Sequence, residues 1–255
     1  MADFEVKIAT EPGEIEEAQR LRFEVFNLEL NKGLQESYAR GLDIDEFDPF
    51  CQHLIVRHLK SGDVVGTYRL LLGSQARRHI GFYSEKEFDL SRIKMLDGEL
   101  LELGRSCARK DYRDRALVPL MWEAITAHAR QHKARYAFGC GSLYTTGTDQ
   151  VSAMFALLKK KYYAPEAQRV MPLEACRFKD LAEDFIIENE PALFQKLPGL
   201  IKGYLRAGAV VCGLPALDAE FGTADFFVML DFAKSKKEYF KRLGMAAEKG
   251  NDAPA

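Results

Sequence analysis

The chain lacks the features that mark several classes of protein. Its five cysteines form no CxxC pair, and this pattern favours reduced thiols over a disulfide framework. The first residues, MADFEVKIAT, lack the basic and apolar regions of a signal peptide, and no apolar run approaches the length of a membrane span. The net charge of −2 gives no overall attraction to nucleic acid. We therefore expect a cytoplasmic protein without a nucleic-acid partner, at most in peripheral contact with the inner membrane surface.

The chain also lacks repeats and low-complexity linkers that would divide it. With 255 residues, of which 47% are apolar, it can bury a substantial core. We predict a single domain over residues 1–245 and a disordered tail over residues 246–255.

The spacing of apolar residues predicts a mixture of strands and helices around a central strand near residues 100–107. The other expected strands cover residues 4–9, 53–59, 64–72, 135–143, 204–212 and 225–232. The expected helices cover residues 11–30, 120–133 and 150–163, together with a charged helical stretch over residues 173–190.

The central strand carries two charges among apolar residues. Leu101 and Leu103 indicate burial, yet Glu102 and Arg105 lie beside them, and buried charges are costly unless they are paired or used. Gly104 is a natural place for a bulge, which would turn both charges to one side and splay this strand from its neighbour. A splayed strand leaves backbone groups free to bind an amide-containing arm or a carbonyl oxygen. A functional cleft is the favoured interpretation, and a Glu–Arg pair that ties the sheet together is the alternative.

A basic turn follows the central strand directly. Arg109, Lys110, Arg113 and Arg115 lie where the strand ends and the next helix begins. The free N–H groups at a helix start favour an anion, so the turn is expected to bind a phosphate-bearing ligand.

Two further features stand out before the central strand. The segment GLDIDEFDPF, residues 41–50, interleaves acids with apolar anchors but lacks the glycine and glutamate spacing of a calcium loop, so no metal site is expected. It either holds a cationic substrate or forms a capped, solvated turn. Arg22 lies at the edge of the apolar stripe of the first helix, where it either serves a site or extends along the helix surface to solvent.

Four short motifs, in the same order along the chain, resemble those of acyl-homoserine-lactone synthases within the GNAT acyltransferase fold. The segments RLRFEVF, DEFD, GTYRLL and ELGRSC match the patterns R..VF, D..D, G..RL and E..R, at residues 20–26, 45–48, 66–71 and 102–107. The segments GFYSEKEFDL and PGLIKGYLRAGAVVCG look closer to the lyso-ornithine-lipid synthase branch, which is often labelled hemolysin-like. The resemblance covers nearly everything from Arg20 to Arg242.

This resemblance implies an α/β GNAT acyltransferase fold, with a mixed central sheet flanked by helices and a C-terminal elaboration. It implies transfer of a (3-hydroxy)fatty acyl group from acyl carrier protein to the α-amine of an amino acid such as ornithine. No permanently bound cofactor is expected; the donor is a phosphopantetheine thioester on acyl carrier protein, or acyl-CoA.

The resemblance also assigns residues to parts of the site. Glu102 is the expected general base, and Arg105 is expected to fix it. The implied acceptor-binding residues are Arg22, Phe26, Asp45, Asp48, Arg69 and Phe82, with the two aspartates facing a cation and the arginines facing a carboxylate or the loop itself. If the two aspartates instead shape the loop or bind Arg22, the acceptor is expected to be selected in the C-terminal segment around Asp218 and Asp225. The implied residues for the phosphopantetheine arm are Ser106, Cys107, Arg109, Arg113 and Arg115.

Three rival functions differ from this expectation. A short-chain N-acetyltransferase that uses CoA is disfavoured, because both glycines of the acetyl-CoA turn are replaced between Arg113 and Val118. A lactone synthase is disfavoured because the aromatic expected after the first helix is missing and NKGLQE stands there instead. A membrane-active protein is disfavoured because no lytic amphipathic helix is present.

Overall fold

The computed structural model describes residues 3–113 and 117–236. Eight strands form the main sheet. In chain order these are β1 (Phe4–Ile8), β2 (Gln52–His58), β3 (Val64–Leu72), β5 (Glu99–Ala108), β6 (Ala134–Leu143), β8 (Val210–Val211), β9 (Ala216–Asp218) and β10 (Thr223–Asp231). A separate two-stranded sheet pairs β4 (Phe88–Asp89) with β7 (Met171–Pro172). The predicted tail over residues 246–255 and the end of the predicted domain lie outside the described residues.

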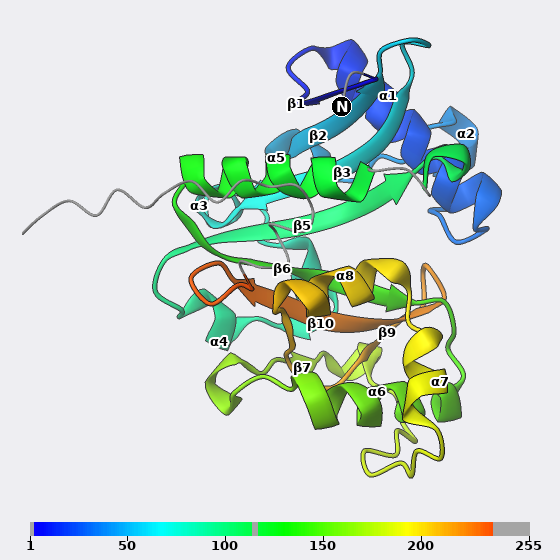
Figure 1. The fold of residues 1–255 in the computed structure, drawn as a ribbon, viewed down its shortest axis with the longest axis vertical. Coiled ribbons are helices and arrows are strands. Elements are labelled where there is room, and N and C mark those ends of the chain that lie inside the picture. The colour runs from blue at the N-terminus through cyan, green and yellow to red at the C-terminus, as the bar shows by residue number, and fades with distance from the viewer. Residues whose placement is uncertain (1–2, 114–116, 237–255) are drawn as a thin grey trace, which may run out of the picture.

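The helices are of unequal length, and the long ones flank the main sheet (Figure 1). The α-helices are α1 (Pro12–Phe23), α2 (Ser37–Arg40), α3 (Gly73–Ala76), α4 (Ser91–Lys94), α5 (Leu117–Gln131), α6 (Thr148–Tyr162), α7 (Glu190–Gln195) and α8 (Gly199–Ala207). A π-helical segment, Glu24–Glu29, continues α1, so the predicted helix over residues 11–30 is confirmed with a change of winding near its end. None of the helices in the described ranges is long and apolar enough to cross a membrane.

The main sheet is mixed, as predicted. Its strand order is β1-β2-β3-β5-β6-β10-β8, with β9 also paired to β10. Only β5 and β6 run parallel, because α5 carries the chain back across the sheet between them; the other neighbours are antiparallel. The GNAT-type mixed α/β fold is therefore confirmed, with α5 between its two central strands.

Helices cover both faces of the sheet, which explains why every residue of β3 is buried. Side chains alternate along β2: Leu54 and Val56 join the apolar cluster that contains Ile125 of α5, whereas Ile55 joins the cluster that contains Leu21 of α1. Strand β2 thus packs against α5 on one face of the sheet and against α1 on the other.

The two central strands pair over only part of their length. Residues 99–102 of β5 pair with residues 134–138 of β6, and beyond this point no pairing joins them. Gly139 lies where they part; a Cβ there would stand 2.2 Å from the carbonyl oxygen of Leu103, so only glycine allows this approach. The outer edges of both strands stay paired, with β3 and β10, so the cleft opens between them.

A bulge in β5 lies beside this opening. Arg69 of β3 pairs with Gly104 and Thr67 pairs with Cys107, so β5 contains one extra residue. The predicted bulge is confirmed, but the residue with a left-handed backbone is Arg105, at φ 47°, and not Gly104. Glu102 and Arg105 consequently point to the same side of the sheet, where both line one cavity.

The C-terminal elaboration differs from the sequence prediction in two places. The predicted strand over residues 204–212 is wrong: α8 occupies its first half, because Ile201, Tyr204 and Leu205 recur at helical spacing, and only β8 is extended. The predicted helix over residues 173–190 is also wrong. Although Phe178, Leu181, Ala182 and Phe185 stand at helical spacing, the segment forms only a short 3-10 turn, Glu174–Cys176, and bonds to its surroundings, as in the hydrogen bond from the Leu173 N–H to the Glu87 carbonyl.

Candidate active site

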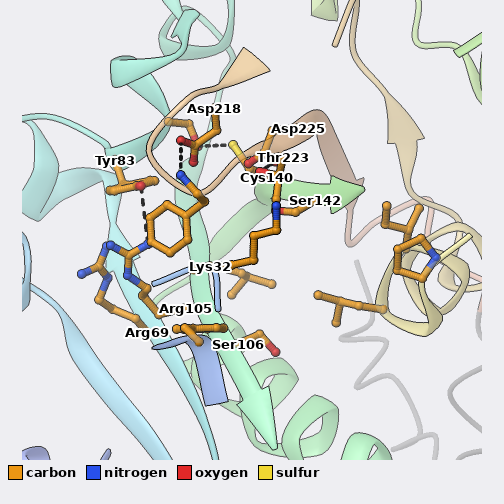
Figure 2. Close-up of a pocket in the computed structure, with 18 of the residues that line it drawn as sticks. Lys32, Arg69, Tyr83, Arg105, Ser106, Cys140, Ser142, Asp218, Thr223 and Asp225 are labelled. Atoms are coloured by element: carbon orange, nitrogen blue, oxygen red, sulfur yellow. Dashed lines mark hydrogen bonds between the residues drawn. The ribbon is translucent and has the colours of Figure 1, made fainter. Parts of the chain in front are cut away.

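A cavity of about 130 Å³ opens where β5 and β6 separate. Its walls come from distant parts of the chain, as Figure 2 shows: Arg105 and Ser106 from β5, Cys140 and Ser142 from β6, and Asp225 from β10. The end of the π-helical segment after α1, β3, the turn before β4, α8 and the turn between β9 and β10 complete the lining. The free edges of the two strands therefore face a cavity that also presents charged and hydroxyl groups.

Glu102 is held firmly at the wall of this cavity. Its Oε2 accepts a hydrogen bond from the Tyr83 N–H at 2.8 Å, and its Oε1 accepts bonds from the N–H and the hydroxyl of Ser84 at 2.8 and 2.6 Å. A carboxylate has about four acceptor sites, so one site remains on Oε2. Burial raises the pKa of Glu102, and the hydrogen bonds from Ser84 and Tyr83 offset part of that rise. The group is therefore a fixed carboxylate whose basicity is increased.

Arg105 does not touch Glu102, contrary to the prediction that it fixes this carboxylate. No ion pair joins the two within the described part of the chain. Instead the guanidinium of Arg105 lies 3.0 Å from Asp45 and 3.3 Å from Asp43, and it stacks over the ring of Tyr83 at 4.9 Å. The alternative of a Glu–Arg pair that ties the sheet together is thereby excluded.

Arg105 belongs to a buried network of three arginines and three aspartates. Its members are Arg22, Arg69, Arg105, Asp43, Asp45 and Asp48. Arg22 is 1% exposed and bonds both carboxylate oxygens of Asp48, so it does not extend to solvent. Burial alone would raise the pKa of Asp45, but the guanidiniums of Arg69 and Arg105 hold that pKa well below its usual range.

The predicted acceptor-binding residues of this network differ in whether they reach the cavity. Arg69 lines the cavity, whereas Arg22, Asp45 and Asp48 do not. The three positive charges match the three negative ones, so the aspartates are already paired. The acidic segment over residues 41–50 is thus a loop pinned to α1 and the sheet, not an open cation-binding loop.

Of the two aromatic residues predicted to bind the acceptor, one lines the cavity and the other does not. Phe26 lines the cavity, and its ring meets the edge of Phe221 at 6.4 Å. Phe82 is 1% exposed and packs edge-on against Phe138 in the apolar core, away from the cavity lining.

The predicted donor residues lie around the end of β5. Ser106 lines the cavity, but Cys107 faces α1 in an apolar cluster, where burial raises the pKa of its thiol. Arg109 pairs with Asp63 and Asp111, and Arg113 pairs with Glu29 at 2.7 Å. Arg115 lies outside the described residues. Both described arginines of the turn are half-exposed, with side-chain exposures of 31% and 37%.

A second group of acids lies at the cavity, and the sequence points to Asp218 and Asp225 only as the alternative to the acidic loop. Asp218 and Asp225 line it, and the buried Glu87 lies behind Cys140. One oxygen of Glu87, one of Asp225 and the Cys140 sulfur lie within 4.8 Å of one another. Burial and the neighbouring Asp225 and Asp218 raise the pKa of Glu87 to about 9, and burial raises that of Asp225 to about 6. The apolar pattern of β10, in which Asp225 is the one acid among Ala224, Phe226 and Phe227, was the available signal.

Related proteins agree with this architecture. The family model described as an acetyltransferase (GNAT) domain matches residues 21–123. The AHL synthase LasI superposes with a TM-score of 0.55 at 13% identity, covering 97% of this chain and 98% of its own. The CoA-dependent acyl-homoserine lactone synthase BjaI gives 0.52 at 14% identity, covering 99% and 94%. At such identities these structures show the fold alone, and that fold is the GNAT type.

Closer relatives define the family. The L-ornithine N(alpha)-acyltransferase of Brucella abortus (strain 2308) is 34% identical, covering 98% of this chain and 92% of that protein. The protein of the same name from Rhodobacter capsulatus is 31% identical and covers 94% and 95%, and that from Rhizobium meliloti (strain 1021) is 34% identical and covers 97% and 86%. The chain belongs to the L-ornithine N(alpha)-acyltransferase family, and it is an acyltransferase.

Proposed function

We propose that the protein transfers a fatty acyl group from acyl carrier protein to the α-amine of ornithine. The observation that carries this proposal is the partly paired β5, which presents a fixed carboxylate and free backbone groups to one cavity. The near full-length relatives named L-ornithine N(alpha)-acyltransferase support the choice of acceptor.

Glu102 is the proposed general base. The α-ammonium of the acceptor must lose a proton before its nitrogen attacks the thioester carbonyl. The remaining acceptor site on Glu102 Oε2 takes that proton, directly or through one water. Because burial raises the pKa of this carboxyl, its basicity lies closer to the working pH than that of an exposed glutamate.

The free edge of β5 supplies the other half of the chemistry. As the nitrogen attacks, the carbonyl oxygen becomes negative, and the backbone N–H groups just after Gly104 are placed to stabilise it. The tetrahedral intermediate then collapses: the carbon–sulfur bond breaks, an amide forms and the pantetheine thiolate takes up a proton. Arg105 carries its charge at the edge of this cavity, where it is a positioning residue for the loop that contains Tyr83.

We assign the donor to the side of the cleft where Ser106 lies. The turn that contains Arg109 and Arg113 is proposed to bind the single phosphate of a carrier-protein phosphopantetheine and the acidic surface of the carrier protein. A glycine-free turn wraps a CoA pyrophosphate less closely, which supports acyl carrier protein over CoA. No permanently bound cofactor is needed for this reaction.

The acceptor is proposed to contact Arg69 and Phe26, which line the cavity. Arg69 offers a guanidinium to the acceptor's carboxylate. Arg22, Asp45, Asp48 and Phe82 act indirectly, by holding the surrounding loops. Because the donor is a cytoplasmic carrier protein and the product carries an acyl chain, we place the enzyme in the cytoplasm, with peripheral contact at the inner membrane surface.

The test is a direct assay of donor and acceptor. Purified protein is incubated with L-ornithine and either 3-hydroxyacyl carrier protein or the matching acyl-CoA, and the products are measured by mass spectrometry. The proposal expects N-acylornithine, formed with a higher kcat/KM from the carrier protein. Product from acetyl-CoA alone, or from S-adenosylmethionine in place of ornithine, would support an N-acetyltransferase or a lactone synthase instead.

A further inference from the structure

Acidic groups gather at one end of the cavity, away from the loop network. Asp225 is 4% exposed and Glu87 is 5% exposed, and both approach Cys140. Asp218 joins them from the end of β9 and lines the same cavity. Figure 2 shows Asp218 and Asp225 at the end of the cavity that also holds Cys140 and Thr223, with Arg69 and Arg105 at another.

These acids have no cation of their own among the described residues. Asp225 accepts a hydrogen bond from the Thr223 hydroxyl at 2.8 Å, and Asp218 accepts two backbone N–H bonds from the following turn. Among the described residues, the Glu87 carboxyl accepts a hydrogen bond from the Cys140 thiol at 4.0 Å and forms no ion pair. A buried carboxylate in this position lacks the positive charge that would make its burial favourable.

The two cations nearby are already engaged. Arg105 is paired with Asp43 and Asp45. The Lys32 ammonium lines the cavity but donates to the Gly222 carbonyl at 2.8 Å. Among the described residues, neither cation therefore forms an ion pair with Asp218, Asp225 or Glu87.

We propose that Asp225 and Asp218, with the buried Glu87 next to Asp225, form the subsite that takes the side-chain ammonium of a diamino acid acceptor. This assignment rests on the proposed function, because it supposes that the α-amine of the same molecule lies at Glu102. The two centres are connected by short contacts: Glu102 bonds the Ser84 hydroxyl at 2.6 Å, which lies 3.5 Å from the Cys140 sulfur. Glu102, Asp218 and Asp225 also line the same cavity, so the two amines of one acceptor can each lie at one of these walls.

An ammonium fits the subsite better than a metal ion does. Glu87, Cys140 and Asp225 could offer three ligand atoms, but a metal needs the thiolate of Cys140. Burial and the nearby Glu87 carboxylate raise the pKa of that thiol well above its ordinary value, which makes metal binding through the thiolate less favourable. Carboxylates alone are the partners that an ammonium prefers.

The experiment compares L-ornithine with L-norvaline, which has the same carbon skeleton without the terminal amine. In wild type, kcat/KM for ornithine is expected to exceed that for norvaline. Asp225→Asn and Glu87→Gln remove a carboxylate and keep the side-chain shape. Each should lower kcat/KM for ornithine by roughly 10- to 100-fold, the scale of a hydrogen bond to a charged group, and leave kcat/KM for norvaline unchanged. Glu46→Gln is the matched control: it removes a carboxylate that is exposed and paired with Lys86, and the preference should not change.

Several outcomes would overturn the assignment. One is an unchanged ratio in both variants, another is an equal loss for norvaline, and a third is loss of the preference on treatment with a metal chelator. Should Asp225→Asn fail to fold, Asp218→Asn at the edge of the cavity gives the same comparison. Calorimetric titration with ornithine and norvaline needs no acyl donor, so it tests the subsite even if the protein proves not to acylate ornithine; equal affinities for the two would refute it.

Discussion

Glu102 lines the cavity and accepts three hydrogen bonds from one loop, which leaves one acceptor site on its Oε2. Glu102→Gln removes the basic group and retains the size of the side chain. We expect turnover to fall by about 100-fold or more, the usual scale for loss of a general base, measured with acyl carrier protein and ornithine. Turnover within a few-fold of wild type would show that the proton is taken elsewhere.

Because Glu102 also anchors the loop at Tyr83, a second variant separates basicity from structure. The Ser84 hydroxyl lowers the pKa of Glu102 through its hydrogen bond, so Ser84→Ala should raise that pKa. The base works when deprotonated, and the acidic limb of the kcat/KM profile should therefore move to higher pH. An unmoved limb, with only a uniform loss of rate, would indicate a structural role for the carboxylate.

Asp48 contributes to stability through buried charge. It faces Arg22 at 2.8 Å and Arg69 at 3.4 Å, so Asp48→Asn leaves two buried guanidiniums short of negative charge. We expect a loss of about 3 to 5 kcal/mol in the free energy of unfolding, measured by urea denaturation. Glu16→Gln, which breaks the exposed pair with Arg20, is the control and should cost about 0.5 kcal/mol or less. Similar losses in both variants would contradict the network's role.

The turn between β5 and α5 is the element expected to recognise the carrier protein. Arg109 and Arg113 are half-exposed at the end of the strand that opens the cleft. Reversing both to Glu should raise the KM for acyl carrier protein, and the KM of wild type should rise with salt, because acyl carrier proteins are acidic. As a control, Lys179→Glu, on the segment after β7, should change neither the KM for acyl carrier protein nor its dependence on salt. A salt-independent KM in wild type would argue against electrostatic docking.

The elements with a clear apolar period could be predicted from sequence, as β2, β3, α5 and α6 show. The bulge was also predictable. Strict alternation would point Glu102 and Arg105 to opposite faces of the sheet, and a bulge at Gly104 brings both to one face. The partners of Arg105 were not, since Asp43 and Asp45 reach it from a loop some 60 positions earlier in the chain. For the same reason the strand that contains Asp225 could be predicted, but its proximity to Glu87 could not. These two residues are far apart in the chain, and only the order of the strands in the sheet brings them together.

The whole molecule should lose stability as pH rises above neutrality. Burial raises the pKa of Glu87 to about 9 and that of Asp225 to about 6, above the values of the unfolded chain. The folded state then keeps protons that the unfolded state has released, so the free energy of unfolding falls as pH rises through this range. The negative charges of Asp218 and Glu102 raise the pKa of Glu87 further, and the positive charge of Arg105 lowers it.

Urea denaturation between pH 7 and pH 9 tests this dependence, because at lower pH the buried His53 and His128, whose pKa values are lowered, make stability rise with pH. The decline should be shallower in Asp225→Asn, which removes one titrating group and lowers the pKa of Glu87. Stability that increases with pH over this range in wild type would mean that the two carboxyls already have cationic partners in the free protein.

The central claim is that one cavity holds both amines of the acceptor, the α-nitrogen at Glu102 and the side-chain ammonium at Asp225. The most direct measurement is tandem mass spectrometry of the product that purified protein forms from L-ornithine and acyl carrier protein. The account predicts acylation of the α-nitrogen alone, because the side-chain amine is held charged at the acidic end. Acylation of the side-chain nitrogen, or of both nitrogens equally, would contradict it.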